Sequence, residues 1–270
     1  RASDQGRNAE WDNTEIMEKT IALRHEKAQL LGFQHYAELS LATKMADSPK
    51  QVTDFLEELA EKSLPQAQKD LAELTAFAKE QCGIEKLYAW DVGYFSEKMR
   101  QHAYDLSQEE VKQYFPAPKV LQGLFAVVEK LYGLNITDIK DFDSWHDDVC
   151  FFQIVDKNNI LRGKFYIDLY ARPKKRGGAW MDDCVGRKKV KGTVQIPVAY
   201  LTCNFTPPVG SDPALLTHDE VLTLFHEFGH GLQHMLTQVD YLGVSGINGV
   251  EWDAVELPSQ FMENWCWEKE

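Results

Sequence analysis

The hydrophobic pattern of the chain changes near Trp145, and this change limits the possible folds more than any other feature. Before Trp145, apolar residues recur at helical spacing in several segments. After it, residues 149–155 and 160–170 are rich in β-branched and aromatic side chains, and the turn residues 156–159 separate them. Two such runs around a short polar turn predict a β-hairpin. The sequence therefore predicts an α+β fold that is mainly α with a small β-sheet.

The predicted domain organisation follows the same change. Residues 1–145 are expected to form a helical region, and residues 146–270 a second region that contains the sheet. Pro65 lies within one helical stretch and is predicted to kink or divide it. Helices are predicted over 14–31, 48–82, 91–104, 107–115 and 118–132, with loops or strands between them.

A third strand is predicted over residues 194–205, after a loop at 182–192. Pro197 lies near the start of this strand. Because proline has no N–H to donate, the strand is expected at an edge of the sheet. An exposed edge can pair with an extended peptide, so this strand is a candidate for substrate binding.

Composition excludes several classes of protein. The 270-residue chain has a formal net charge of −13, which disfavours a nucleic acid as partner. The sequence contains no run of about 18 apolar residues, so no membrane partner is expected. Five cysteines without a C-x-x-C pair favour a cytoplasmic location. The chain starts at Arg1 and stops within a helical pattern, so we expect a fragment truncated at both ends.

The motif with the clearest chemical meaning is His226-Glu227-Phe228-Gly229-His230. Thr217 and Glu220 form a predicted capping box, so a helix is expected from there to about residue 236. Two histidines four residues apart lie on one face of a helix, where both imidazoles can reach one metal ion. The carboxylate of Glu227 lies beside that face and can reach a water molecule on the metal.

A catalytic zinc ion needs a third protein ligand and one open position. Glu256 follows His226 by thirty residues, in a predicted helix over 252–265 that contains an unusual Pro258. The glycine-spaced loop 243–249 can reverse the chain between the two helices. Glu263 lies seven residues beyond Glu256 on the same helical face, so it is predicted to accept the second N–H of a ligating histidine.

These segments resemble the thimet oligopeptidase (neurolysin-like) family of zinc metallopeptidases. The two signature segments are residues 226–231 and 256–265, and the resemblance covers essentially the whole chain. Similar stretches also occur at 1–4, 166–172, 176–180 and 197–205. The resemblance implies a zincin-like catalytic region at 146–270, with one Zn²⁺ held by His226, His230 and Glu256.

The resemblance also implies the function. It predicts a zinc metalloendopeptidase, an oligopeptidase that hydrolyses internal bonds of short peptides with Glu227 as general base. Helices that follow this region in full-length members carry substrate-binding groups, so the fragment is expected to have low activity. The sequence leaves the oligomeric state and the preferred peptides undefined.

Two other interpretations of the same residues stay open. Glu227 and His230 also form a Glu-x-x-His pair, which is typical of di-iron carboxylate proteins. That chemistry needs a second such pair, and the chain has none. The fragment can also be a non-catalytic metal-binding or scaffold piece. His234, one turn beyond His230, is too far along the helix to share the same ion and is predicted to be structural.

Overall fold

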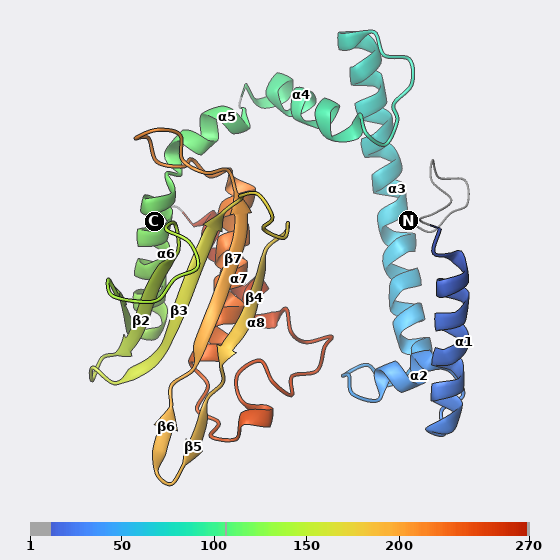
Figure 1. The fold of residues 1–270 in the computed structure, drawn as a ribbon. Coiled ribbons are helices and arrows are strands. Elements are labelled where there is room, and N and C mark those ends of the chain that lie inside the picture. The colour runs from blue at the N-terminus through green and yellow to red at the C-terminus, as the bar shows by residue number, and fades with distance from the viewer. Residues whose placement is uncertain (1–11, 106, 269–270) are drawn as a thin grey trace. The chain divides into compact units, whose positions relative to one another are not determined.

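The computed structural model describes residues 12–105 and 107–268 (Figure 1). The chain divides into two units, which are described separately. The described part of the first unit comprises residues 12–72 and 251–254, and that of the second unit comprises most of residues 73–250 and 255–268. The stretch 1–4, one of those on which the family resemblance rests, lies outside the described residues.

The first unit is helical and contains α1 (Thr14–Leu30), α2 (Tyr36–Leu41) and the first part of α3 (Pro49–Cys82). The Ser48 hydroxyl accepts a hydrogen bond from the Gln51 N–H at 3.2 Å, which caps the start of α3. The helix continues without a break through Pro65, so this proline does not divide it, and the alternative prediction of a kink stays a prediction. Pro65 removes only one backbone hydrogen bond, and water can replace it because this stretch is exposed.

The helical part of the second unit begins with the end of α3. It continues with α4 (Val92–Tyr104), α5 (Gln108–Val111), the 3₁₀ helix η2 (Lys112–Tyr114) and α6 (Ala117–Tyr132). These elements match the helices predicted from the sequence to within a few residues. Gly133 ends α6 with a φ of 65°, a conformation that glycine adopts without steric cost.

A five-stranded sheet has the order β1-β2-β3-β7-β4. The predicted hairpin is confirmed, because β2 and β3 pair antiparallel. The β3–β7 pair is parallel and the β4–β7 pair antiparallel. A separate two-stranded sheet pairs β5 with β6. The bounds of the strands are β1 (Leu134–Asp138), β2 (Cys150–Asp156), β3 (Leu161–Tyr170), β4 (Trp180–Val185), β5 (Lys188–Val190), β6 (Thr193–Gln195) and β7 (Val198–Phe205).

The prediction that residues 194–205 form an edge strand is wrong. β7 lies between β3 and β4 and is paired on both sides. Pro197 comes immediately before the first residue of β7, so its missing N–H interrupts no pairing, and its carbonyl accepts the Lys164 N–H at 3.0 Å. The edge strand next to β7 is β4, which lies partly in the segment predicted as a loop, and β1 forms the other edge.

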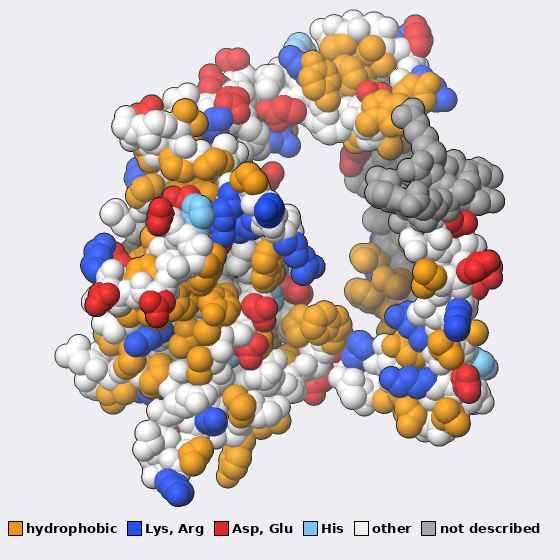
Figure 2. Space-filling view, viewed as in Figure 1, with side chains coloured by type: hydrophobic (Ala, Val, Ile, Leu, Met, Phe, Trp, Pro, Cys, Tyr) orange, Lys and Arg blue, Asp and Glu red, His pale blue; other side chains and the backbone are white. Residues whose placement is uncertain are grey.

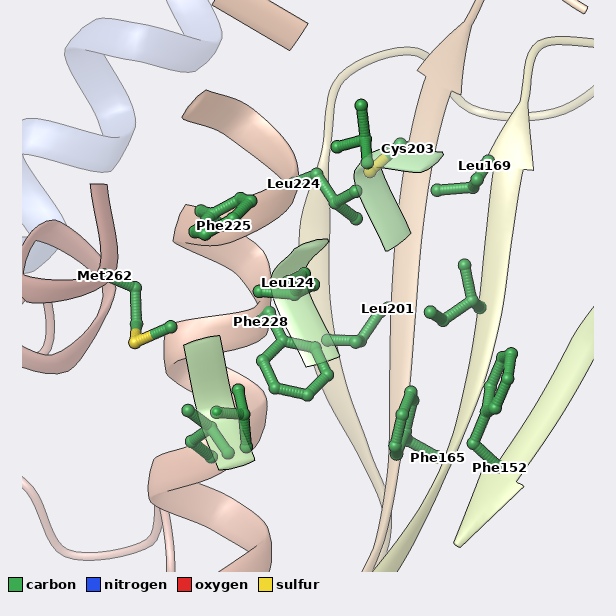
Figure 3. Close-up of a cluster of buried hydrophobic side chains, with 14 of the residues drawn as sticks. Leu124, Phe152, Phe165, Leu169, Leu201, Cys203, Leu224, Phe225, Phe228 and Met262 are labelled. Atoms are coloured by element: carbon green, nitrogen blue, oxygen red, sulfur yellow. The ribbon is translucent and has the colours of Figure 1, made fainter. Parts of the chain in front are cut away.

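The core of the second unit lies between the sheet and the helices α6 and α7 (His218–Met235). Leu124 on α6, Phe228 on α7 and Phe165 on β3 are fully buried and meet in this layer (Figure 3). The Phe165 and Phe228 rings lie 5.3 Å apart, edge to face. α6 and β1 belong to this layer although both precede residue 145, and the division at that residue stays a prediction.

The opposite face of the sheet carries aromatic side chains, and hydrophobic groups gather over the strands there (Figure 2). The rings of Phe151 and Tyr166 stack with centroids 4.1 Å apart, and the ring of Tyr200 lies 5.4 Å from that of Tyr166. Because successive side chains of a strand point to opposite faces, Tyr166 faces away from the core that Phe165 enters.

The chain reverses after α7 through a loop with the 3₁₀ helix η3 (Leu242–Val244) and returns as α8 (Leu257–Glu263) and the 3₁₀ helix η4 (Asn264–Trp267). The predicted helix over 252–265 therefore starts later than expected. Pro258 occupies its first turn, where no backbone N–H is needed, and so explains the start. None of the described helices is long and apolar enough to span a membrane.

Candidate metal centre

Helix α7 places the two histidines of the motif. The predicted capping box is present: the Glu220 N–H donates to the Thr217 hydroxyl, and the Thr217 N–H donates to the Glu220 carboxylate. The apolar side of the helix packs against the sheet, which leaves His226 and His230 at the partly exposed side. Their side chains are 25% and 18% exposed, so a metal ion and a small ligand can reach them.

Glu256 completes a group of three possible ligands. One oxygen of its carboxylate, Oε2, lies 3.1 Å from His226 Nε2 and 3.2 Å from His230 Nε2. Among the described residues, these side chains offer ligand atoms that all lie within 4.8 Å of one another. Ligands about 2.1 Å from a tetrahedral zinc ion are about 3.4 Å apart, so small side-chain movements fit the group to zinc. Two imidazoles and one carboxylate are a donor set typical of catalytic zinc.

Glu263 lies behind His226. Its Oε1 atom is 2.6 Å from His226 Nδ1, so the nitrogen that does not face Glu256 has a carboxylate partner. A histidine that binds a metal through Nε2 commonly donates its Nδ1–H to such a group. Glu263 thus contacts the ring nitrogen opposite Glu256, and its role as partner of a metal-binding histidine stays a prediction.

Glu227 is 6% exposed and lies next to His226 in the helix. Burial raises the pKa of Glu227 to about 6, and the nearby Glu256 carboxylate acts in the same direction. A positive charge on His226 and a hydrogen bond from the Met181 N–H of β4 oppose this increase. The carboxyl group therefore has a proton affinity suited to exchanging protons near neutral pH.

The electrostatics of His230 favour metal binding. Burial lowers the pKa of His230, although the Glu256 carboxylate partly offsets this effect. A lower pKa keeps the imidazole neutral, and only the neutral ring can bind a metal ion. The site thus combines a neutral donor, a carboxylate donor and an adjacent buried acid.

Three other ionisable residues near these segments have different positions or partners. His234 is fully buried, and its Nε2 lies 3.0 Å from the Val185 carbonyl at the end of β4, so its position agrees with a structural role. Asp219 is in the first turn of α7. Asp253, in the other unit, accepts hydrogen bonds from the backbone N–H groups of Met45 and Ala46.

Sequence reasoning missed Ser259. Its hydroxyl lies 2.8 Å from Glu256 Oε2, the same oxygen that faces both imidazoles. A serine three residues after a glutamate has no characteristic spacing for metal binding. Only the position of Pro258, which marks the start of α8, could have indicated that Ser259 turns back toward Glu256.

Comparison with known proteins identifies the family. The sequence model of peptidase family M3 matches residues 1–270. The chain belongs to peptidase family M3. It is 62% identical to oligopeptidase A of Escherichia coli over its whole length and 58% identical to oligopeptidase A of Haemophilus influenzae. It is also 46% identical, over 97% of its length, to the organellar oligopeptidase A of Arabidopsis thaliana.

The comparisons also limit what carries over to this chain. The chain spans 40% of the length of the two bacterial relatives and 34% of the Arabidopsis protein. Another Arabidopsis relative is a probable cytosolic oligopeptidase A, so relatives occur in more than one compartment, and the cytoplasmic location stays a prediction. The family is one of metallopeptidases, which supports the interpretation as a peptidase over that as a di-iron carboxylate protein.

Proposed function

We propose that the second unit of this chain forms the zinc centre of an endopeptidase that hydrolyses internal bonds of short peptides. The observation that carries the proposal is the convergence of three ligand atoms on one point, with the buried Glu227 next to them in the helix. His226, His230 and Glu256 would hold the ion. The names of the relatives support the peptide substrate class.

Each side chain has a distinct task in this proposal. When bound, zinc lowers the pKa of a water ligand to about 7 and polarises a peptide carbonyl. Glu227 accepts the proton of the attacking water and later donates it to the departing amine. Glu263 keeps the Nδ1 proton on His226, so that Nε2 is the free donor.

The free edge of β4 is the proposed binding surface for the substrate backbone. This replaces the predicted role of residues 197–205, because β7 is paired on both sides. β4 contacts α7, and the Met181 N–H of β4 is directed to Glu227. A peptide that pairs with the edge through its backbone is bound largely independently of its sequence, which suits hydrolysis of varied short peptides.

Zinc binding is the most direct test, since it depends on residues within this chain. Equilibrium dialysis against zinc, followed by metal analysis, should give one ion per chain. Glu256→Ala should bind the ion more weakly, whereas Glu227→Gln should retain it. Hydrolysis of a quenched fluorescent peptide, with and without chelator, then tests the activity. A chain that binds no zinc at neutral pH would contradict the proposal, and zinc binding without hydrolysis would favour the scaffold alternative.

A further inference from the structure

Of the three proposed ligands, Glu256 is the least restrained by its surroundings. Its side chain is 51% exposed, against 25% for His226 and 18% for His230. It occupies the N-cap position of α8, yet its carboxylate makes no capping hydrogen bond to the helix backbone. A half-exposed glutamate has many accessible rotamers, and fixing one of them costs conformational entropy. Some other contact must hold the carboxylate beside the imidazoles.

The Ser259 hydroxyl provides that contact. Ser259 is fully buried, and its Oγ atom lies 2.8 Å from Glu256 Oε2 and 2.9 Å from the Glu256 carbonyl oxygen. The single hydroxyl proton can be donated to either oxygen. Oε2 is also the atom that lies 3.1 Å from His226 Nε2 and 3.2 Å from His230 Nε2. Ser259 thus holds the one carboxylate oxygen that faces both histidines.

Contact between the two helices fixes the position of Ser259. A Cβ atom at Gly229 would lie 2.4 Å from the Pro258 carbonyl oxygen and 2.6 Å from Ser259 Cα. The α8 backbone therefore packs directly on α7, in the turn between His226 and His230. The distance from the hydroxyl to the two imidazoles is set by this backbone contact, not by a flexible connection.

We propose that Ser259 is a positioning residue that holds Glu256 Oε2 in the geometry for metal binding before the ion arrives. This inference rests on the proposed function, because it assumes that Glu256 is a zinc ligand. A ligand held in place in the metal-free chain loses less entropy on binding, so the hydroxyl increases zinc affinity.

The test compares zinc affinities, measured by competition with a chromophoric chelator, in the 270-residue chain. We expect Ser259→Ala to weaken zinc binding about 10–100-fold, as is usual for partners of metal ligands. Ser245→Ala is the matched control. Ser245 is also fully buried, but its hydroxyl has no hydrogen-bond partner among the described residues, so its removal should leave zinc affinity unchanged. Thermal unfolding of the metal-free variants checks that each is folded.

A double-mutant cycle separates this inference from the proposed function. If Ser259 acts through Glu256, adding Ser259→Ala to Glu256→Ala should cause no further loss of zinc affinity. If Ser259→Ala lowers zinc affinity equally in the wild type and in Glu256→Ala, the positioning role is wrong. It is also wrong if Ser259→Ala folds and binds zinc with unchanged affinity. If Glu256→Ala itself binds zinc as the wild type does, the proposed ligand set fails.

A second pair of variants covers the case in which Ser259→Ala does not fold. Ser259→Thr keeps the hydroxyl. In Ser259→Val the side chain has nearly the same shape as threonine but lacks the hydroxyl. The threonine variant should bind zinc at least tenfold more tightly than the valine variant. Equal affinities of the two would contradict the proposal.

Discussion

The Glu263 carboxylate lies 2.6 Å from His226 Nδ1, while Glu256 Oε2 lies 3.1 Å from Nε2 of the same ring. The imidazole of His226 is thus held between two carboxylates from the two ends of α8. Because Nδ1 has an acceptor beside it, the neutral ring keeps its proton there and directs the lone pair of Nε2 to the proposed ion.

Glu263→Ala should therefore weaken zinc binding about 10–100-fold, because His226 loses the group that fixes its tautomer and orientation. Glu263→Gln should have a smaller effect, since its amide oxygen can still accept the Nδ1–H. Chelator competition measures both affinities. If the alanine variant binds zinc as tightly as the wild type, Glu263 is an ordinary surface acid.

Glu227→Gln should separate metal binding from chemistry. Glutamine has nearly the same shape as glutamate but cannot accept the proton of water. We expect zinc content to be unchanged and peptide hydrolysis to fall about 10²–10⁴-fold, the usual contribution of a general base. Metal analysis and the quenched-peptide assay on the same preparation give both values. Undiminished hydrolysis in a zinc-loaded variant would rule out Glu227 as the base.

His226 and His230 could be identified from the sequence as candidate ligands, because they lie four residues apart on a helix that a capping box begins. Glu256 lies outside that helix, and the family resemblance pointed to it. The edge strand could not be predicted. β4 includes Asp182 and Asp183, whose charges hide the alternation that indicates a strand, so the segment was predicted to be a loop. Pro197 led to the wrong prediction of an edge strand, because it lies one residue before β7 and not within it.

The two residues that contact the proposed ligands, Glu263 and Ser259, also differ in whether the sequence predicts them. Glu263 could be predicted, since seven residues along a helix return to the same face. Ser259 could not, because its contact with Glu256 depends on where α8 begins and on the close approach of α8 to Gly229. Such backbone contacts leave no periodic signal in one sequence.

Gly229→Ala should test that close approach. Alanine is favoured over glycine in a helix by about 1 kcal/mol. At Gly229, however, the new Cβ would meet the backbone of Pro258 and Ser259, which cannot move as a flexible side chain does. We expect α8 to shift, the free energy of unfolding to fall by about 1–3 kcal/mol, and zinc affinity to fall at least tenfold.

Gly123→Ala on α6 is the control for this substitution, because a Cβ at Gly123 meets no atom within 4 Å. It should stabilise the chain by about 0.5–1 kcal/mol and leave zinc binding unchanged. Urea unfolding and chelator competition measure both variants. A stabilised Gly229→Ala with normal zinc affinity would show that the two helices do not need this contact.

Asp168 should make the stability of the second unit depend on pH in the acid range. Burial raises the pKa of Asp168, but hydrogen bonds from Arg172, Lys175 and Trp145 outweigh this effect and lower it to about 2. The unfolded value is about 3.9. The ionised carboxylate therefore stabilises the fold by about 2 kcal/mol above pH ~4, and this contribution is lost as the pH falls from ~4 through ~2.

Asp168→Asn should accordingly destabilise the chain at pH 7, and the difference from wild type should shrink by about 2 kcal/mol as the pH approaches 2. The loss at pH 7 also includes the cost of leaving the buried Lys175 ammonium without its carboxylate. Asp54→Asn is the control, since the Asp54–Lys50 pair is exposed and should contribute less than about 1 kcal/mol. Urea titrations of the three proteins between pH 7 and pH 2.5 measure these differences. If the free energies of unfolding of Asp168→Asn and wild type differ by the same amount at every pH, the three partners do not hold the carboxylate in its ionised form.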